Sequence, residues 1–169
     1  MSRGIPSDQV DFDAPYRPFW EPLGRLVFAF SYLEKDLNWC VAALAGLEPI
    51  TLAAGELVGS MPSFALRVKK VRVSLTARNA AGDDWGALEQ RLLSLSQFRN
   101  FAFHGLWTAF SLTAWDMGEP AWQVQKVDPK TKRLKFEEIS VTSLEHAARE
   151  AQRVSVDLMR YVQPIVDPR

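Results

Sequence analysis

Residues 98–107 are Phe98-Arg99-Asn100-Phe101-Ala102-Phe103-His104-Gly105-Leu106-Trp107, and the hydrophobic pattern of the chain changes at Gly105. Before this glycine, Leu88, Leu92 and Leu95 repeat at helical spacing; after it, apolar and polar residues alternate as in a β-strand. At about 100° per residue, the next position on the leucine stripe is Arg99. An unpaired buried arginine is costly, so Arg99 is expected to meet an anion, an acidic side chain or a polar interface.

Two further polar residues in this stretch lie on another face of the same helix. Asn100 and His104 are four positions apart and therefore neighbours on the helix surface. Arg99 and His104 are five positions apart, so in a straight helix they point well away from each other. For both to act on one phosphate, the helix must end or bend near them, or two copies of the chain must face each other.

The rest of the chain is predicted to be mainly helical. Apolar periodicity and helix-stop residues predict helices at about 22–44, 51–58, 60–78, 83–104 and 142–163. The last of these opens with Thr142-Ser143-Leu144-Glu145, which has the form of a capping box. Residues 1–21 are polar and contain Pro6, Pro15 and Pro18, so they are expected to form an extended arm.

The first helix has an unusually wide apolar face. Leu26, Phe30 and Leu33 belong to its main stripe, and Phe28 and Tyr32 lie on its flank. Such a helix either sits centrally in a bundle or presents a second apolar face to a partner. We give equal weight to a core position and to a dimer contact.

The segment after Gly105 is predicted to be a β-meander. Alternating aromatic and β-branched residues indicate strands at 106–115, 121–127 and 133–139, separated by turn sequences. Trp107, Trp115 and Trp122 could stack on bases, but packing on the helices is the preferred interpretation. The predicted fold class is therefore mainly α: a bundle of four to five helices with a three-stranded antiparallel meander (106–140) inserted before the C-terminal helix. We expect one domain, 22–169.

The helix at 60–78 is the one strongly basic element of the chain. It carries Arg67, Lys69, Lys70, Arg72 and Arg78 and no acidic residue. An RNA backbone contact requires such a surface, so Arg67, Lys70 and Arg78 are candidate RNA-binding residues. A solvated helix face is the simpler alternative.

Composition excludes several classes of protein. Twenty basic and twenty acidic residues give zero net charge, so a general nucleic-acid or membrane binder is not expected. A single cysteine and the lack of a signal-peptide pattern favour a cytoplasmic protein. We expect no metal and no cofactor, because neither zinc-ligand spacing nor a phosphate-binding or nucleotide-binding motif is present.

Arg99, Asn100 and His104 are the candidate catalytic residues. A histidine exchanges a proton near neutral pH, and a guanidinium group matches a phosphate and stabilises its developing charge. An amide can orient the histidine or a sugar hydroxyl. Together these groups suit RNA cleavage by its own 2′-hydroxyl, which gives a cyclic phosphate and a free 5′-hydroxyl without a metal ion.

The same residues resemble the motif of the HEPN superfamily (higher eukaryotes and prokaryotes nucleotide-binding). Its signature is an arginine, usually followed by a polar residue, and then a histidine after four to six positions. Arg99-Asn100 followed by His104-Gly105 and Trp107 is similar to this pattern in many small prokaryotic HEPN-like proteins. The resemblance implies an α-helical bundle, and it leaves the meander unplaced.

The resemblance also implies a function. Many HEPN proteins are metal-independent ribonucleases of toxin–antitoxin, phage-defence or RNA-processing systems, and two motifs typically meet across a homodimer. By resemblance, Arg99 would bind the phosphate, His104 would transfer protons and Asn100 would support them. The alternative is a non-catalytic HEPN-like dimer that binds a nucleotide or a protein, with Arg99 held by an acidic residue such as Glu34 or Glu89. A cognate antitoxin or other partner protein is a third, weaker expectation.

Overall fold

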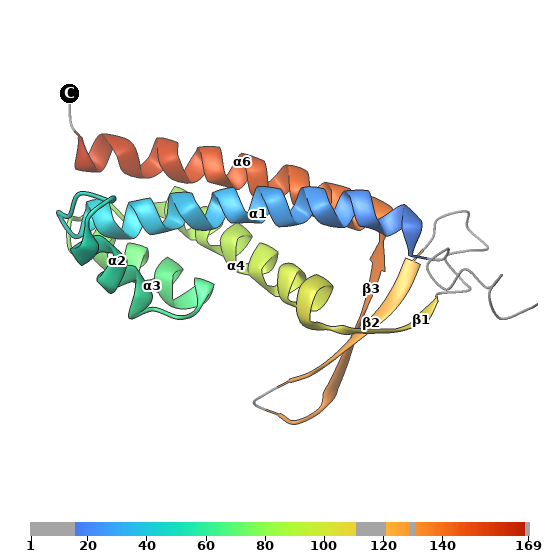
Figure 1. The fold of residues 1–169 in the computed structure, drawn as a ribbon. Coiled ribbons are helices and arrows are strands. Elements are labelled where there is room, and N and C mark those ends of the chain that lie inside the picture. Colours follow the sequence, from blue (N-terminus) through green and yellow to red (C-terminus); the bar gives the residue numbers. More distant parts are fainter. Residues whose placement is uncertain (1–15, 111–120, 129–130, 168–169) are drawn as a thin grey trace, which may run out of the picture.

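The computed structural model describes residues 16–110, 121–128 and 131–167. Its helices are α1 (Arg17–Leu44), α2 (Leu52–Gly59), α3 (Phe64–Thr76), α4 (Asp83–His104) and α6 (Val141–Val166). The strands are β1 (Leu106–Phe110), β2 (Ala121–Val127) and β3 (Leu134–Ser140). The predicted fold class is confirmed: the chain is mainly helical, and a three-stranded antiparallel sheet precedes the C-terminal helix (Figure 1).

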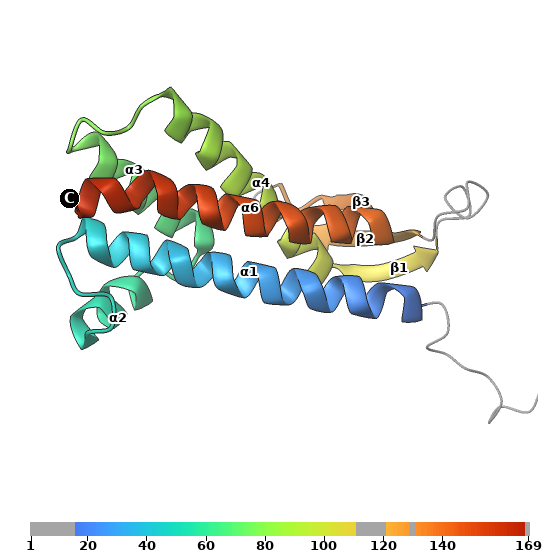
Figure 2. The ribbon, with the colours of Figure 1, turned by 90° about the horizontal axis from the view of Figure 1, so that it is seen from above.

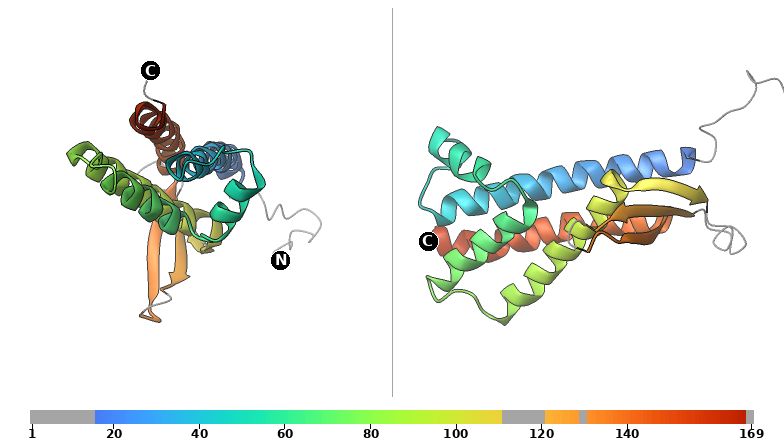
Figure 3. Two further views of the ribbon diagram at one scale, coloured as in Figure 1. Left: turned by 90° about the vertical axis from the view of Figure 1, so that its left-hand side faces the viewer. Right: turned by 90° about the horizontal axis from the view of Figure 1, so that it is seen from below.

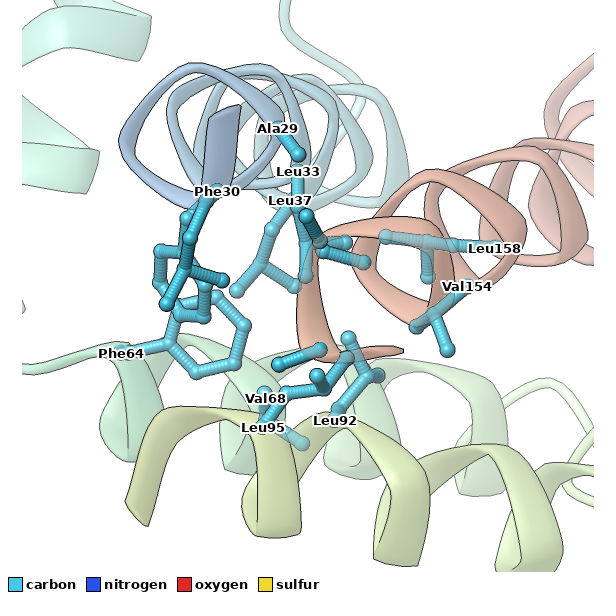
Figure 4. Packing of buried hydrophobic residues seen from close by; sticks show 14 of the residues in the cluster. Ala29, Phe30, Leu33, Leu37, Phe64, Val68, Leu92, Leu95, Val154 and Leu158 are labelled. Atoms are coloured by element: carbon cyan, nitrogen blue, oxygen red, sulfur yellow. The ribbon is translucent and has the colours of Figure 1, made fainter. Parts of the chain in front are cut away.

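The long helices α1 and α6 form the centre of the fold. They lie side by side and run in the same direction, and α4 crosses beneath them (Figures 1 and 2). The main stripe of α1 is fully buried, and residues of α3, α4 and α6 meet it in one cluster (Figure 4). The side chains at the centre of this cluster are Phe30, Leu33, Leu37, Val68, Leu92, Val154 and Leu158. Their burial supplies most of the favourable free energy of folding.

Helix α1 begins at Arg17, so residues 17–21 are helical and do not belong to the predicted extended arm. Pro18 lies in the first turn, where its missing N–H is tolerated, and Pro22 lies inside the helix. Aromatic contacts hold this early start on the sheet: Tyr16 stacks on Trp122 at 4.4 Å, and Phe19 meets Trp107 edge-on at 5.7 Å between ring centroids. Sequence reasoning missed this start because the stabilising contacts are distant in sequence.

The predicted starts of α3 and α6 also shift, whereas α4 keeps its predicted bounds of 83–104. Helix α3 begins at Phe64, because Ser63 accepts a hydrogen bond from the Leu66 N–H and acts as the N-cap. Gly82 takes the N-cap position of α4. The capping box of α6 is formed by Ser140 and Ser143 rather than by Thr142 and Glu145, since each serine hydroxyl accepts the other residue's N–H.

The sheet has the order β1-β2-β3, and both strand pairs are antiparallel. One of its faces packs on the helices through Trp122, Val124 and Ile139, which are buried. The β2–β3 hairpin projects away from the helices (Figure 3). Trp107 packs against Phe19 of α1 and against Trp122, which agrees with the preferred interpretation that these tryptophans pack on the helices. Residues 1–15 of the predicted arm and residues 111–115 of the first predicted strand, with Trp115, lie outside the described part of the chain.

Gly105 ends α4 as predicted. Glycine at the C-terminal end of a helix usually adopts the left-handed conformation, but here the reason for glycine is different. Its φ is −79° and its ψ is 154°, so it does not adopt the left-handed conformation. A Cβ atom at this position would lie 2.2 Å from Cγ1 of Val124 and 2.5 Å from the carbonyl oxygen of Phe101. The residue must be glycine because strand β2 packs directly against the end of the helix.

Gly105→Ala should therefore destabilise the fold by about 2 kcal/mol, because Val124 and the end of α4 must move apart. Chemical denaturation followed by circular dichroism measures the change. Gly86→Ala is the matched control: Gly86 lies in α4 with no atom within 4 Å of an added Cβ, so this substitution should stabilise the helix by about 0.5–1 kcal/mol. Equal stability of the two variants would contradict the close approach of Val124.

Cys40 is fully buried in α1, and burial raises the pKa of its thiol to about 12, with the charge of Asp36 acting in the same direction. We expect the folded protein to resist alkylation by iodoacetamide at about pH 8, and the unfolded protein to react. The raised pKa also means that stability is lost as the pH rises from about 9 toward 12, since only the unfolded thiol ionises there. The chain has one cysteine, so mass spectrometry assigns the label without ambiguity. Labelling of the native protein as fast as of the denatured protein would contradict this burial.

Candidate functional site

Arg99 lies where the leucine stripe of α4 predicts it, next to the core. Its guanidinium group sits over the ring of Phe30 at 5.1 Å and over the ring of Phe103 at 5.5 Å. About a quarter of the side chain is exposed (26%). The two rings cover the apolar stem and attract the cation, which offsets part of the cost of removing it from water.

One carboxylate is shared by two arginines beside α1. Oε1 of Glu34 lies 3.8 Å from Nη2 of Arg99 and 3.7 Å from Nη2 of Arg67. Arg67 also donates a hydrogen bond of 2.7 Å to the side-chain oxygen of Asn38. We call these four residues the Glu34 cluster. The pairing of Arg99 with Glu34 is the arrangement expected for the non-catalytic alternative.

The Glu34 cluster carries an excess of positive charge. Two guanidinium groups and one carboxylate leave a formal charge of +1. The Nε–H groups of Arg67 and Arg99 are both buried and donate no hydrogen bond to any of the described residues. Neither arginine reaches normal hydrogen-bonding distance of Glu34, so both keep donor groups that an anion could use.

His104 is the last residue of α4, and its side chain is exposed. Among the described residues, no hydrogen bond or ion pair reaches its imidazole. Asn100 is half-buried on the same side of the helix, and its carbonyl oxygen accepts a long hydrogen bond of 3.5 Å from Lys126. His104 is therefore accessible to a substrate or to another protein chain.

Helix α4 continues without a break through both Arg99 and His104. At about 100° per residue, five positions rotate the side-chain direction by about 140°. Arg99 accordingly points toward α1 and α3, whereas His104 points to solvent. Within one chain, the helix neither ends nor bends early enough to turn the two side chains to the same side.

The basic face of α3 is largely occupied by contacts within the chain. Arg67 belongs to the Glu34 cluster, and Arg72 lies 3.6 Å from Glu89. Arg78 donates hydrogen bonds to the carbonyl oxygens of Leu44 (2.7 Å) and Ser74 (3.1 Å), so it satisfies the C-terminal end of α1. Of the three candidate RNA-binding residues, Lys70 is the one for which no such contact is recorded within the described chain. The sequence could not reveal this, because Glu34 and Asn38, the partners of Arg67, and the Leu44 carbonyl group bound by Arg78 lie on α1.

A groove of about 860 Å³ lies between α4 and α6, on the side of α4 away from α3. Apolar side chains such as Leu95 and Phe98 line it, together with the exposed His146. At its end, Arg91 pairs with Glu150 at 2.7 Å and with Asp157 at 2.8 Å. These hydrogen bonds, first that of Glu150, raise the pKa of Arg91 above its ordinary value. The sequence did not reveal this groove, because the groove has no local signature in the chain.

Comparison with known proteins leaves the family open: no protein-family model, no curated protein and no solved structure matches this chain. Within residues 16–110, 121–128 and 131–167, no three His, Cys, Asp or Glu side chains come together as a metal site would require. None of the described helices is both long and apolar enough to span a membrane.

Glu34→Gln should lower the free energy of unfolding by about 1 kcal/mol, because it removes the only charge that balances two partly buried guanidinium groups in the cluster. Urea denaturation at low salt measures the effect. Glu56→Gln is the matched control, since Glu56 is exposed on α2 and its substitution should change stability by less than about 0.5 kcal/mol. A Glu34→Gln protein as stable as the wild type would show that the arginines do not need this carboxylate.

Proposed function

We propose that the chain is a metal-independent endoribonuclease of HEPN type that acts as a homodimer, of the kind found in toxin–antitoxin and defence systems. The observation that carries this proposal is the arrangement on α4. Arg99 retains unused donors beside an excess positive charge, and His104 is exposed without a partner in the described chain, yet an unbroken helix turns them apart. A second chain that brings its His104 to Arg99 would complete the site.

In the proposed reaction, the 2′-oxygen of a ribose attacks the adjacent phosphorus and the bond to the 5′-oxygen breaks. His104 takes the proton of the 2′-hydroxyl, and the imidazolium so formed returns this proton to the departing 5′-oxygen. Arg99 stabilises the added negative charge on the non-bridging oxygens, and Asn100 orients the imidazole or the sugar. The products are a 2′,3′-cyclic phosphate and a 5′-hydroxyl, and no metal ion is needed.

The first test is incubation of the purified protein with mixed RNA in EDTA, followed by analysis of the fragment ends. We expect cleavage by the wild type with 2′,3′-cyclic phosphate ends and a loss of at least about 100-fold in His104→Ala, since a general acid–base group contributes about this much. His146→Ala is the matched control, because it removes the other histidine of the chain and should leave cleavage unchanged. Cleavage that survives in His104→Ala would refute the proposal.

A mixed dimer tests whether the site is shared between chains. When Arg99→Ala and His104→Ala chains carry different tags and are co-purified, each heterodimer should keep one intact site of two, and so about half of the wild-type activity. Each variant alone should be inactive. An inactive heterodimer, with a confirmed one-to-one composition, would refute a site built from Arg99 of one chain and His104 of the other.

The ion pair between Arg99 and Glu34 favours a second function: a non-catalytic HEPN-like dimer that binds a nucleotide or a partner protein. In this alternative the Glu34 cluster stabilises the bundle and His104 has no role in proton transfer. A dimeric wild type that cuts no RNA but binds a nucleotide in calorimetry would support this alternative over the nuclease.

A further inference from the structure

Helix α1 carries a second apolar face that the described chain leaves uncovered. Four large side chains on it are about half exposed: Trp20 (53%), Val27 (46%), Phe28 (62%) and Tyr32 (50%). The rings of Phe28 and Tyr32 contact each other at 4.8 Å. We call these four residues, with Gly24 and Ser31 between them, the outer face of α1.

The outer face of α1 points away from the core. Leu26, Leu33 and Leu37, on the opposite side of the helix, are fully buried. In Figure 2, α1 lies at the edge of the bundle, with α2 near its C-terminal end. Phe28 also borders α6, because it lines a small pocket together with Ala148 and Gln152. A concentration of Trp, Phe and Tyr on one exposed helix is typical of a protein interface, in which these residue types contribute most of the binding energy.

We propose that a second copy of this chain covers the outer face, with the two α1 helices packed antiparallel and centred on Phe28. This inference extends the proposed function, which requires two chains, by assigning the surface that joins them. It does not depend on RNA cleavage, because an interaction module would dimerise through the same face.

The antiparallel register is supported by complementary residues at equal distances from Phe28. Gly24 and Tyr32 lie four positions to either side, so the glycine of each helix faces the tyrosine of the other. A Cβ at Gly24 would meet no atom within 4 Å, so its surroundings are open to a partner side chain. Glu21 and Lys35 lie seven positions to either side, and each would face the opposite charge. Glu21 also pairs with Arg25 of its own chain at 2.6 Å, so Lys35 of the partner would join an existing ion pair. In a dimer with two-fold symmetry, each of these contacts occurs twice.

The outer face also leads directly to the Glu34 cluster. Val27, Ser31, Glu34 and Asn38 follow one another at intervals of three or four residues, and therefore form a single row along α1. A partner that covers Val27 and Ser31 comes to lie beside Glu34, and so beside Arg99, which is 3.8 Å from it. This continuity favours a second copy over an unrelated partner, because the arrangement on α4 is incomplete without another His104.

Sedimentation of the full chain tests the interface. We expect a wild-type dimer and a dissociation constant raised at least about 30-fold in Phe28→Glu, as for a central aromatic contact. Val73→Glu on α3 and Phe136→Glu on the β2–β3 hairpin are matched controls, since both side chains are more than half exposed on other surfaces (54% and 57%). These controls should remain dimeric, and circular dichroism should show native helix content in all variants.

A charge exchange tests the register. Lys35→Glu should weaken the dimer by about 10-fold, because it places two glutamates opposite each other twice, and the double variant Glu21→Lys/Lys35→Glu should restore it. Failure of the double variant to restore the dimer would overturn the antiparallel register.

A monomeric wild type, a Phe28→Glu dimer of unchanged affinity, or dissociation by Phe136→Glu alone would each overturn the proposed interface. The cleavage assay is read separately. A dimer that depends on Phe28 but cuts no RNA keeps the interface and rejects the nuclease, whereas a monomer that cuts RNA rejects the interface and the shared site together.

Discussion

The packing of Val124 against Gly105 is the constraint on which the arrangement of the candidate residues depends. Strand β2 can approach the end of α4 because no side chain stands between them. The helix therefore stops at His104, and the chain turns at once into β1. A longer helix would carry His104 into its interior and remove the sheet from the start of α1, where Tyr16 and Phe19 pack on its tryptophans. The position of the histidine and the start of the first helix thus have a common physical origin.

The Glu34 cluster brings together the three helices α1, α3 and α4 through charge rather than through apolar contact alone. Arg67 and Arg99 come from different helices and share one carboxylate, so neither is fully neutralised. Full neutralisation would make the arginines purely structural, and complete exposure would let water compete for them. An intermediate environment of this kind is where an incoming anion gains most from a guanidinium group. The same argument explains why an ion pair within the chain is compatible with both proposed functions.

The sequence predicted the features that depend on local pattern. The period of Leu88, Leu92 and Leu95 placed Arg99 beside the core, and alternation after Gly105 identified the sheet. It did not predict what depends on distant partners. Pro18 suggested an arm that reaches residue 21, but contacts with the sheet stabilise helix from Arg17 onward. The basic residues of the predicted helix 60–78 appeared as one surface, but Arg67 and Arg78 turn toward α1. For the candidate site, the sequence placed His104 on a different face of the helix from Arg99, whereas the role of Glu34 required the tertiary structure to choose between two acidic residues.

The pairing of α1 with α6 has a consequence for how the protein forms during synthesis. The two helices are the first and last of the described elements, and their contacts are among the most distant in the sequence: Ser155 donates a hydrogen bond to Asp36 across 119 positions. The stripe of Leu26, Leu33 and Leu37 therefore lacks the cover that α6 supplies until this helix has left the ribosome. Contacts of such high sequence separation form late and slowly. A nascent chain that exposes both apolar faces of α1 until α6 has emerged is a natural client for chaperones.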